Sequence, residues 1–565
     1  MKNKRAQSWL IALAMTTALF AYALTQLDVR FAVNDDAATL HFFQGYQTGT
    51  PASFHIYITG LLAWPLHWLG TLAPTVAWFT WMQLGFLFLS CVVMAKSVMQ
   101  CFLKRRQPLW LGAAAAACLL VCLVLKSVAR ITFTQTAAVL GAAAVLQILS
   151  IEHEHPRKVI VGMLGALGLV VLAYSLRQLT ALPILAFCGL AWLCTLCEEY
   201  GKQAKRSAKP MLIALLAVAV VMGALAGLRE MEINLGGHCE QIEWQQARIG
   251  LIDYYHIAGL SDEAVNAAGW SPATHRLINE WCFLDSSVTT ESFRAALEVA
   301  QREDPRTLAD AWPTFTSAVQ GAGNDVWGLA LTAAVLVCCV LGAALSKERR
   351  GWLAAIGCTV LGALAMIAYL AVAGRLPARA ILMVMLPASA MLFGLLPACV
   401  KADRRAMALC TIVFVAVSVW YAVAVVPGLY PDEEEELMLG SAMGDMEEYA
   451  LGEPESLFIY DSTLAGADQR AFPDYSEGMP HNILFWGGWG YRAPETIQLL
   501  ENYGIDIDNF DPETFLRDDV YLVSGRVDPP PVRLMEWITE KTGKEIDWEI
   551  YSEYGSVYIL HFYEY

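Results

Sequence analysis

Two adjacent carboxylates, Asp35 and Asp36, are the residues of this chain best suited to chemistry. They follow Asn34, just after the first long apolar segment. A carboxylate at a membrane surface can deprotonate an incoming hydroxyl or bind a metal ion that bridges a phosphate. The alternative is that Asn34 or Asp35 only caps a helix that begins near Asp36 and ends at Gly45.

Arginines at one end of several apolar segments form a second candidate group. They are Arg130, Arg177, Arg375 and Arg379. Guanidinium groups bind phosphate oxygens in a bidentate fork, so a lipid-linked phosphate or pyrophosphate would explain the group. For any one of these arginines, snorkelling to the interface or pairing with a loop carboxylate is the simpler explanation.

A long polar segment, residues 229–325, carries side chains suited to sugar hydroxyls and ring faces. They are Arg248, Asp253, Tyr254, Tyr255, His256, Trp281 and Asp285. A folded helical cap would use the same residue types. The aromatic turn from Phe485 to Arg492 can likewise stack on carbohydrate or pack the C-terminal domain onto the membrane cap.

Composition places these residues on a membrane protein. Hydrophobic residues make up 56% of the 565 and charged residues only 16%, which no soluble fold of this length could bury. The pattern predicts a mainly α-helical, polytopic bundle of about eleven spans. We place them near residues 9–27, 75–99, 109–127, 133–151, 159–176, 179–197, 211–228, 326–345, 352–373, 380–398 and 406–426.

Basic clusters orient the bundle, because Lys and Arg are retained in short cytoplasmic loops. Each cluster falls on the side of the N-terminus, which we therefore expect to be cytoplasmic. The clusters are Lys104/Arg105/Arg106, Arg157/Lys158, Lys202/Lys205/Arg206/Lys209, Lys347/Arg349/Arg350 and Lys401/Arg404/Arg405. The segment from Phe54 to Leu72 is apolar enough to span, but counting it would invert this pattern. We expect it to form a juxtamembrane helix in the outer leaflet, with a true span as the alternative.

The predicted organisation is a membrane domain, residues 1–427, and an extracytoplasmic α/β domain, residues 428–565. The membrane domain includes outer loops at 28–74, with juxtamembrane helices, and at 229–325. In the second loop Ser271 and Thr290 are expected to cap helices. Strands in the C-terminal domain are predicted at 457–460, 482–486, 520–523, 547–551 and 557–562, and helices at 494–503 and 532–542.

Charge, cysteine content and missing motifs exclude several classes of partner and cofactor. Beyond Pro427 lie 30 of the 54 acidic residues against seven basic ones, which argues against nucleic acid. Only Cys239 and Cys282, of fourteen cysteines, fall in outer segments, where they can pair or remain free. The chain has no P-loop, dinucleotide fingerprint or zinc-ligand spacing, which leaves ATP-driven transport and nicotinamide chemistry without support.

One span, an outer loop with an acidic pair, juxtamembrane helices and a many-helix bundle resemble the GT-C superfamily of membrane glycosyltransferases. The match rests on Asn34-Asp35-Asp36 and the segment from Phe54 to Leu72. The segment Tyr46-Gln47-Thr48-Gly49-Thr50-Pro51, followed by His55, also resembles uncharacterised bacterial members. The sequence has Asp-Asp where many members show Asp-Glu or a lone Asp.

The resemblance implies a bilayer enzyme that transfers sugar from a polyprenyl-phosphate donor to a cell-envelope glycan, lipid or protein. Asp35 and Asp36 would be the base and a metal or substrate ligand, in an order left open, and Asp36 would hold any divalent cation. Substrate contacts would come from Asn34, His55, Arg130, Arg177, Arg248, Asp253, Arg375 and Arg379. The alternatives are a transporter or flippase and a non-catalytic envelope sensor with extracellular domains.

Overall fold

The computed structural model divides the chain into two compact units. It describes residues 2–152, 156–199, 204–255, 257–321, 326–344, 349–399, 404–430 and 442–565. The first unit holds residues 1–29, 81–228 and 308–430, and the second holds 30–80, 229–307 and 431–565. The second unit therefore gathers the first outer loop, the long loop and the C-terminal region, which are far apart in sequence.

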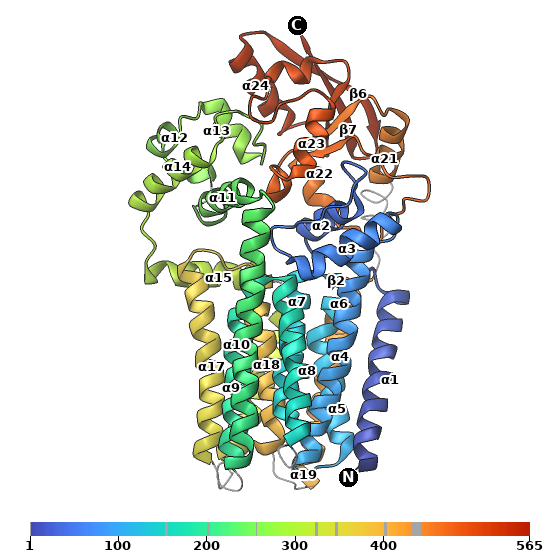
Figure 1. Cartoon of the computed structure of the whole chain (residues 1–565), viewed down its shortest axis with the longest axis vertical. Helices are drawn as coiled ribbons and strands as arrows, with labels where there is room; N and C mark the ends of the chain where they lie inside the picture. The colour runs from blue at the N-terminus through green and yellow to red at the C-terminus, as the bar shows by residue number, and fades with distance from the viewer. Residues whose placement is uncertain are drawn as a thin grey trace. The chain divides into compact units, whose positions relative to one another are not determined.

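The first unit is a bundle of long helices (Figure 1). Each predicted span coincides with a helix: α1 (Lys2–Gln26), α4 (Trp78–Lys104), α5 (Leu109–Leu119) continuing through a π-helical turn into α6 (Leu125–Ala129), α7 (Phe133–Ser150), α8 (Pro156–Leu176), α9 (Ala181–Glu199), α10 (Ala204–Leu235), α16 (Val326–Ala344), α17 (Arg349–Val372), α18 (Ala378–Cys399) and α19 (Arg404–Ala424).

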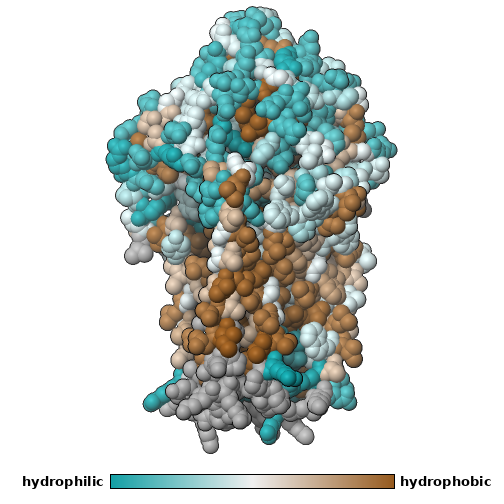
Figure 2. Space-filling view, in the orientation of Figure 1, coloured by the Kyte–Doolittle hydropathy of each residue, from teal (hydrophilic) through white to brown (hydrophobic). Residues whose placement is uncertain are grey.

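Nine of the spans predicted from the sequence are confirmed. Among the described residues, nine helices are long and apolar enough to cross a membrane, so the protein is a multi-pass membrane protein. The other two expected spans lie in α10 and α16, each of which includes residues whose side chains are not described. On the face drawn in Figure 2, the surface of this helical unit is mainly hydrophobic, as contact with lipid requires.

Helix α7 forms the centre of the bundle. It packs against α8, α9 and α18, and 94% of its residues are buried. A Cβ on Gly141 of α7 would lie 2.3 Å from the Ile184 side chain of α9, so only glycine allows this approach. Small residues at helix contacts are the usual means of close packing in membranes.

The second unit is built on a five-stranded mixed sheet of order β4-β3-β5-β7-β6. The strands β3 (Leu457–Tyr460), β4 (Ile483–Phe485) and β5 (Val520–Ser524) are parallel. Strand β7 (Val557–Glu564) is antiparallel to β5 and forms a hairpin with β6 (Ile546–Tyr554). All five predicted strands are confirmed, since alternating and buried apolar runs are local signals.

Both faces of this sheet are covered. Leu457, Ile459 and Leu522 pack against side chains of the long loop and of the C-terminal helices. Phe458, Tyr460 and Val523, on the other face, pack with Met446 and with Tyr46 from the first outer loop. The helices are α11 (Cys239–Arg248), α12 (Asp262–Ala267), α13 (Pro272–Asn279) and α14 (Thr290–Glu303) of the long loop, and α21 (Ala442–Gly452), α22 (Ser462–Ala467), α23 (Pro494–Asn502) and α24 (Pro531–Thr542).

The helix caps and the cysteines of the long loop were also predicted from the sequence. Ser271 caps α13, as expected. The cap of α14 is Thr289 rather than Thr290, because Thr289 and Ser292 form a reciprocal capping box. Cys239 and Cys282 are both free thiols, so they form no disulfide in this structure. The acidic run at 432–436 lies outside the described residues.

The segment from Phe54 to Leu72 contains the helix α3 (Gly60–Leu72), whose 13 residues extend about 20 Å and cannot cross a bilayer. The exclusion of this segment as a span is confirmed. Leu61, Trp64, Trp68 and Leu72 form one exposed apolar stripe on α3. Such a stripe is typical of a helix in the membrane interface, and its placement there stays a prediction.

Candidate functional site

Asp35 and Asp36 lie in the first turn of α2 (Asn34–Gln44), within the second unit. Asp36 is fully buried and Asp35 is partly exposed. Adjacent residues of a helix point about 100° apart, so one carboxylate faces the protein and the other reaches its surface.

The capping alternative is wrong for the start of this helix. The N-cap position is Val33, which makes no side-chain capping hydrogen bond, and Asn34 is an exposed residue inside the first turn. The end of the helix is as predicted: Gly45 adopts φ 77°, and its amide donates to carbonyls of the last turn.

His55 supports α2 from the loop that follows it. Its side chain is 2% exposed. The Nδ1 atom accepts from the amides of Tyr57, at 3.1 Å, and Ile58, at 3.3 Å, so the proton lies on Nε2. Nε2 donates to Thr39 Oγ1 at 3.1 Å, and that hydroxyl donates to the Asp35 carbonyl at 2.7 Å. This chain of hydrogen bonds fixes the turn that carries Asp35; a substrate contact by His55 stays a prediction.

Arg229, at the end of α10, holds the same loop and was not singled out from the sequence. It is 5% exposed, and its guanidinium donates to the carbonyls of His55 at 2.8 Å and Ile56 at 2.9 Å. It also contacts Glu232 at 3.2 Å and lies 4.5 Å from the ring centroid of Phe54. The position of a basic residue after an apolar segment does not indicate that its partners are backbone carbonyls 174 and 173 residues earlier.

The aromatic turn after β4 packs against the first outer loop. The Trp489 ring lies 4.4 Å from that of His55 and 4.9 Å from that of Phe42, centroid to centroid. Thr496 contacts Gln47 at 3.5 Å. The packing role that we considered for this turn is therefore the one that the structure describes.

The long-loop candidates have mainly protein partners. Arg248 is buried, donates to Gln245 at 3.0 Å and lies 5.6 Å from the Trp281 ring centroid. Asp253 is partly exposed. Asp285 is buried and accepts from Thr274, Ser287 and Trp537 and pairs with Lys541 at 2.8 Å. Burial alone would raise the pKa of the Asp285 carboxyl, but these donors outweigh it and lower that pKa.

The four candidate arginines belong to the first unit. Arg130 follows α6 and pairs with Asp28 at 3.3 Å. Arg177 follows α8 and lies 5.1 Å from the ring centroid of Phe133. Arg375 and Arg379 are partly exposed and lie where α17 connects to α18. Successive spans alternate in direction, so all four lie at the bundle end where α1 finishes. Their binding of phosphate stays a prediction.

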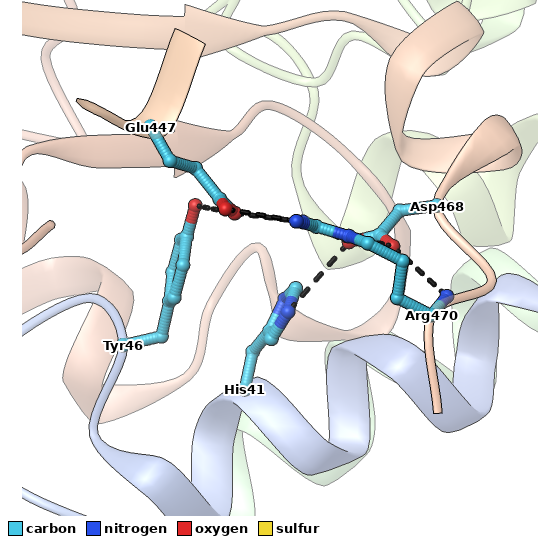
Figure 3. Close-up of polar contacts among 5 residues, drawn as sticks. All are labelled: His41, Tyr46, Glu447, Asp468 and Arg470. Carbon is cyan, nitrogen blue, oxygen red and sulfur yellow. Dashed lines mark hydrogen bonds and ion pairs between the residues drawn. The ribbon is translucent and has the colours of Figure 1, made fainter. Parts of the chain in front are cut away.

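Buried charges join the end of α2 to the C-terminal region, and sequence reasoning missed them (Figure 3). The Arg470 guanidinium donates to Glu447 at 2.7 and 2.8 Å, and Tyr46 donates to Glu447 at 2.9 Å. His41 Nε2 lies 3.6 Å from Asp468, and neither of its nitrogens has a hydrogen-bond partner among the described residues.

The protonation of this network follows from burial and pairing. Burial lowers the pKa of His41, because the imidazolium would lose its hydration, and this outweighs the attraction of Asp468. Burial would raise the pKa of Asp468, but Arg470 and His41 lower it to about 2. At neutral pH the network therefore holds a neutral His41 and ionised Asp468 and Arg470.

Comparisons with known proteins give one likeness. No protein-family model and no curated protein matches the chain. A crystal structure of ArnT from Cupriavidus metallidurans bound to undecaprenyl phosphate aligns with 98% of this chain and 97% of that one, at 14% identity and a TM-score of 0.35. This is a low overall likeness.

Proposed function

We propose that the chain is a membrane glycosyltransferase that moves a sugar from a polyprenyl-phosphate donor to a hydroxyl of a cell-envelope glycan, lipid or protein. The observation that carries the proposal is the acidic pair in the first turn of α2. This helix begins shortly after the first membrane-spanning helix, and its partly exposed Asp35 adjoins a buried Asp36. Such a carboxylate is available to a hydroxyl and held by a rigid element.

Asp35 is the better base, because its side chain reaches the surface. It accepts the proton of the acceptor hydroxyl as that oxygen bonds to the anomeric carbon of the sugar. The bond from that carbon to the donor phosphate breaks, and the lipid phosphate leaves with the electron pair. Attack opposite the leaving group inverts the anomeric carbon. Buried Asp36 orients the turn and adds negative charge beside the base.

Arginines at the bundle end where α1 finishes supply the charge that the leaving phosphate needs. Arg130, Arg177, Arg375 and Arg379 are the candidates, and Asn34, His55, Arg248 and Asp253 remain candidates for contacts with the sugar or acceptor. Preorganised guanidinium groups stabilise a developing phosphate charge without reorganisation during the reaction.

A divalent cation stays a prediction, with Asp36 as its protein ligand. Within the described part of the chain, no three His, Cys, Asp or Glu side chains gather to hold a metal. Phosphate oxygens of the donor and water would have to complete the coordination of such an ion.

Asparagine variants of the two acids test the proposal. Purified full-length protein is incubated with polyprenyl-phosphate sugars and extracted envelope polymer, and transfer is followed by mass spectrometry. Loss of a general base typically costs 10²–10⁴-fold, so Asp35→Asn should lower kcat by about that factor. Asp36→Asn should also impair transfer, because an uncharged amide replaces a buried carboxylate.

The matched control is Asp262→Asn. Asp262 is an exposed acid in the first turn of α12, in the same unit, so its replacement should leave transfer unchanged. If wild-type protein transfers sugar and both Asp35→Asn and Asp36→Asn transfer it equally well, the site assignment is wrong. Absence of transfer from every donor tried would favour the transporter or sensor alternative.

A further inference from the structure

Residues 468–471 of the C-terminal region contact the first outer loop at two places and the start of α4 at a third. The Phe31 amide, just before α2, donates to the Gln469 carbonyl at 2.8 Å. Near the other end of α2, His41 lies 3.6 Å from Asp468. The Thr80 hydroxyl, in the first turn of α4, donates to the Ala471 carbonyl at 2.6 Å. Four successive residues therefore contact the chain just before the acidic turn of α2, the later part of α2 and the start of α4.

Arg470 holds this segment in place. Its Nε donates to Asp468 at 3.1 Å, and its two terminal nitrogens donate to Glu447 on α21. Glu447 and Asp468 are each 4% exposed. The ring of His41 stacks on Tyr46 at 4.4 Å and lies 5.9 Å from that of Phe485. Figure 3 shows the guanidinium between the two carboxylates, with His41 below it and the Tyr46 hydroxyl pointing to Glu447.

We propose that Arg470, with Glu447 and Asp468, is a positioning residue for the acidic pair of α2. The inference rests on the proposed glycosyl transfer and assigns the C-terminal region a part in it. Asp36 and His41 are separated by about 7.5 Å along one short helix, so a displacement at His41 moves the carboxylates with it. A misplacement of about 1 Å at a reacting group can cost 10²-fold in rate.

The conservative variant Arg470→Lys tests this role in the full chain. Lysine keeps the charge but has no planar fork, so it cannot bind both carboxylates as Arg470 does. We expect kcat to fall about 10–100-fold while KM for the lipid donor stays within about twofold, because binding groups are untouched. Amide hydrogen exchange within α2 should rise, while that of β3 and β5 should not change.

Arg517→Lys is the matched control. Arg517 pairs with Asp519 at 2.6 Å in the same region, and both side chains are more than one-third exposed, so neither kcat nor exchange in α2 should change. If Arg470→Lys does not fold, Tyr46→Phe provides a second test. It removes only the hydroxyl that donates a hydrogen bond to Glu447, so it should lower kcat and raise exchange in α2 by less than Arg470→Lys.

Two outcomes would overturn the proposal. One is unchanged exchange in α2, which would mean that the network does not hold the helix. The other is increased exchange in α2 with unchanged kcat, which would mean that the held position does not matter for transfer. Failure of the proposed function itself looks different: wild-type protein would transfer no sugar, yet exchange in α2 would still respond to Arg470→Lys.

Discussion

Asp35 and Asp36 show that two identical, adjacent side chains can lie in different environments. Asp35 and Asp36 are neighbours of one type, but only Asp36 is buried. The sequence indicated a reactive pair and could not indicate which member faces inward, because the buried face of α2 also contains Thr39, His41 and Gln44. Apolar periodicity, on which such assignments depend, is therefore weak in this helix.

Burial of His41 should make the stability of the chain depend on pH. Its lowered pKa means that the folded chain binds fewer protons than the unfolded chain below about pH 6.5. The stability that neutral His41 contributes is thus complete above that pH and is lost as pH falls toward the lowered pKa. Facing it are Asp468, Glu447 and Arg470, of which Asp468 titrates near 2, outside this window.

The variant His41→Phe keeps a ring between Tyr46 and Phe485 and removes the titrating group. Melting temperatures of the full chain should fall less between pH 7 and pH 5 in this variant than in wild type, as measured by differential scanning fluorimetry. An equal fall in both proteins would contradict a buried neutral His41.

Elements were predictable where their signals are local. The five strands, the start of α13 at Ser271 and the hairpin of β6 and β7 all follow from short patterns, and the structure confirms them. Partnerships between elements were not predictable. Arg229 with His55 and Tyr46 with Glu447 join residues separated by 174 and 401 positions, and one sequence carries no record of such pairs.

Asp285 joins two helices, because its carboxylate accepts hydrogen bonds from Thr274 of α13 and Trp537 of α24. Asp285→Ala leaves the Trp537 and Thr274 donors and the Lys541 charge without their shared partner. Removing one member of a buried charged pair costs about 3–5 kcal/mol, and partial exposure of Lys541 places the expected loss near the lower value.

Hydrogen-exchange free energies of core amides in β5 measure this loss. The control is Glu243→Ala, at an exposed ion pair with Arg294, which should change the same amides by less than about 0.5 kcal/mol. Equal effects of the two substitutions would mean that Asp285 does not join the helices energetically.

The chain passes repeatedly between its two units, so each unit is assembled from segments that are far apart in sequence. The second unit takes residues from 30–80, 229–307 and 431–565. On the surface drawn in Figure 2 this unit is mainly hydrophilic, unlike the helical unit. If the three segments occupy one compartment, as the basic loops predict, the topology of the spans must return the chain to the same side before each of them.

Reporter fusions test that topology. Alkaline phosphatase fused after Pro427, beyond α19, should be active, because it would lie outside the cytoplasm. The same enzyme fused after Gln107, beyond α4, should be inactive. A cytoplasmic signal at Pro427 would reverse the predicted side of the C-terminal region and of both carboxylates.

The separation of Tyr46 from Glu447 also has a consequence for biosynthesis. The two residues are 401 positions apart, and ribosomes add about 5–20 residues per second, so α2 leaves the ribosome roughly 20–80 s before Glu447 does. During that interval the acidic turn lacks the network that holds it. A chain whose translation stops early would carry both carboxylates without their support, so we expect the activity to appear only when synthesis is essentially complete.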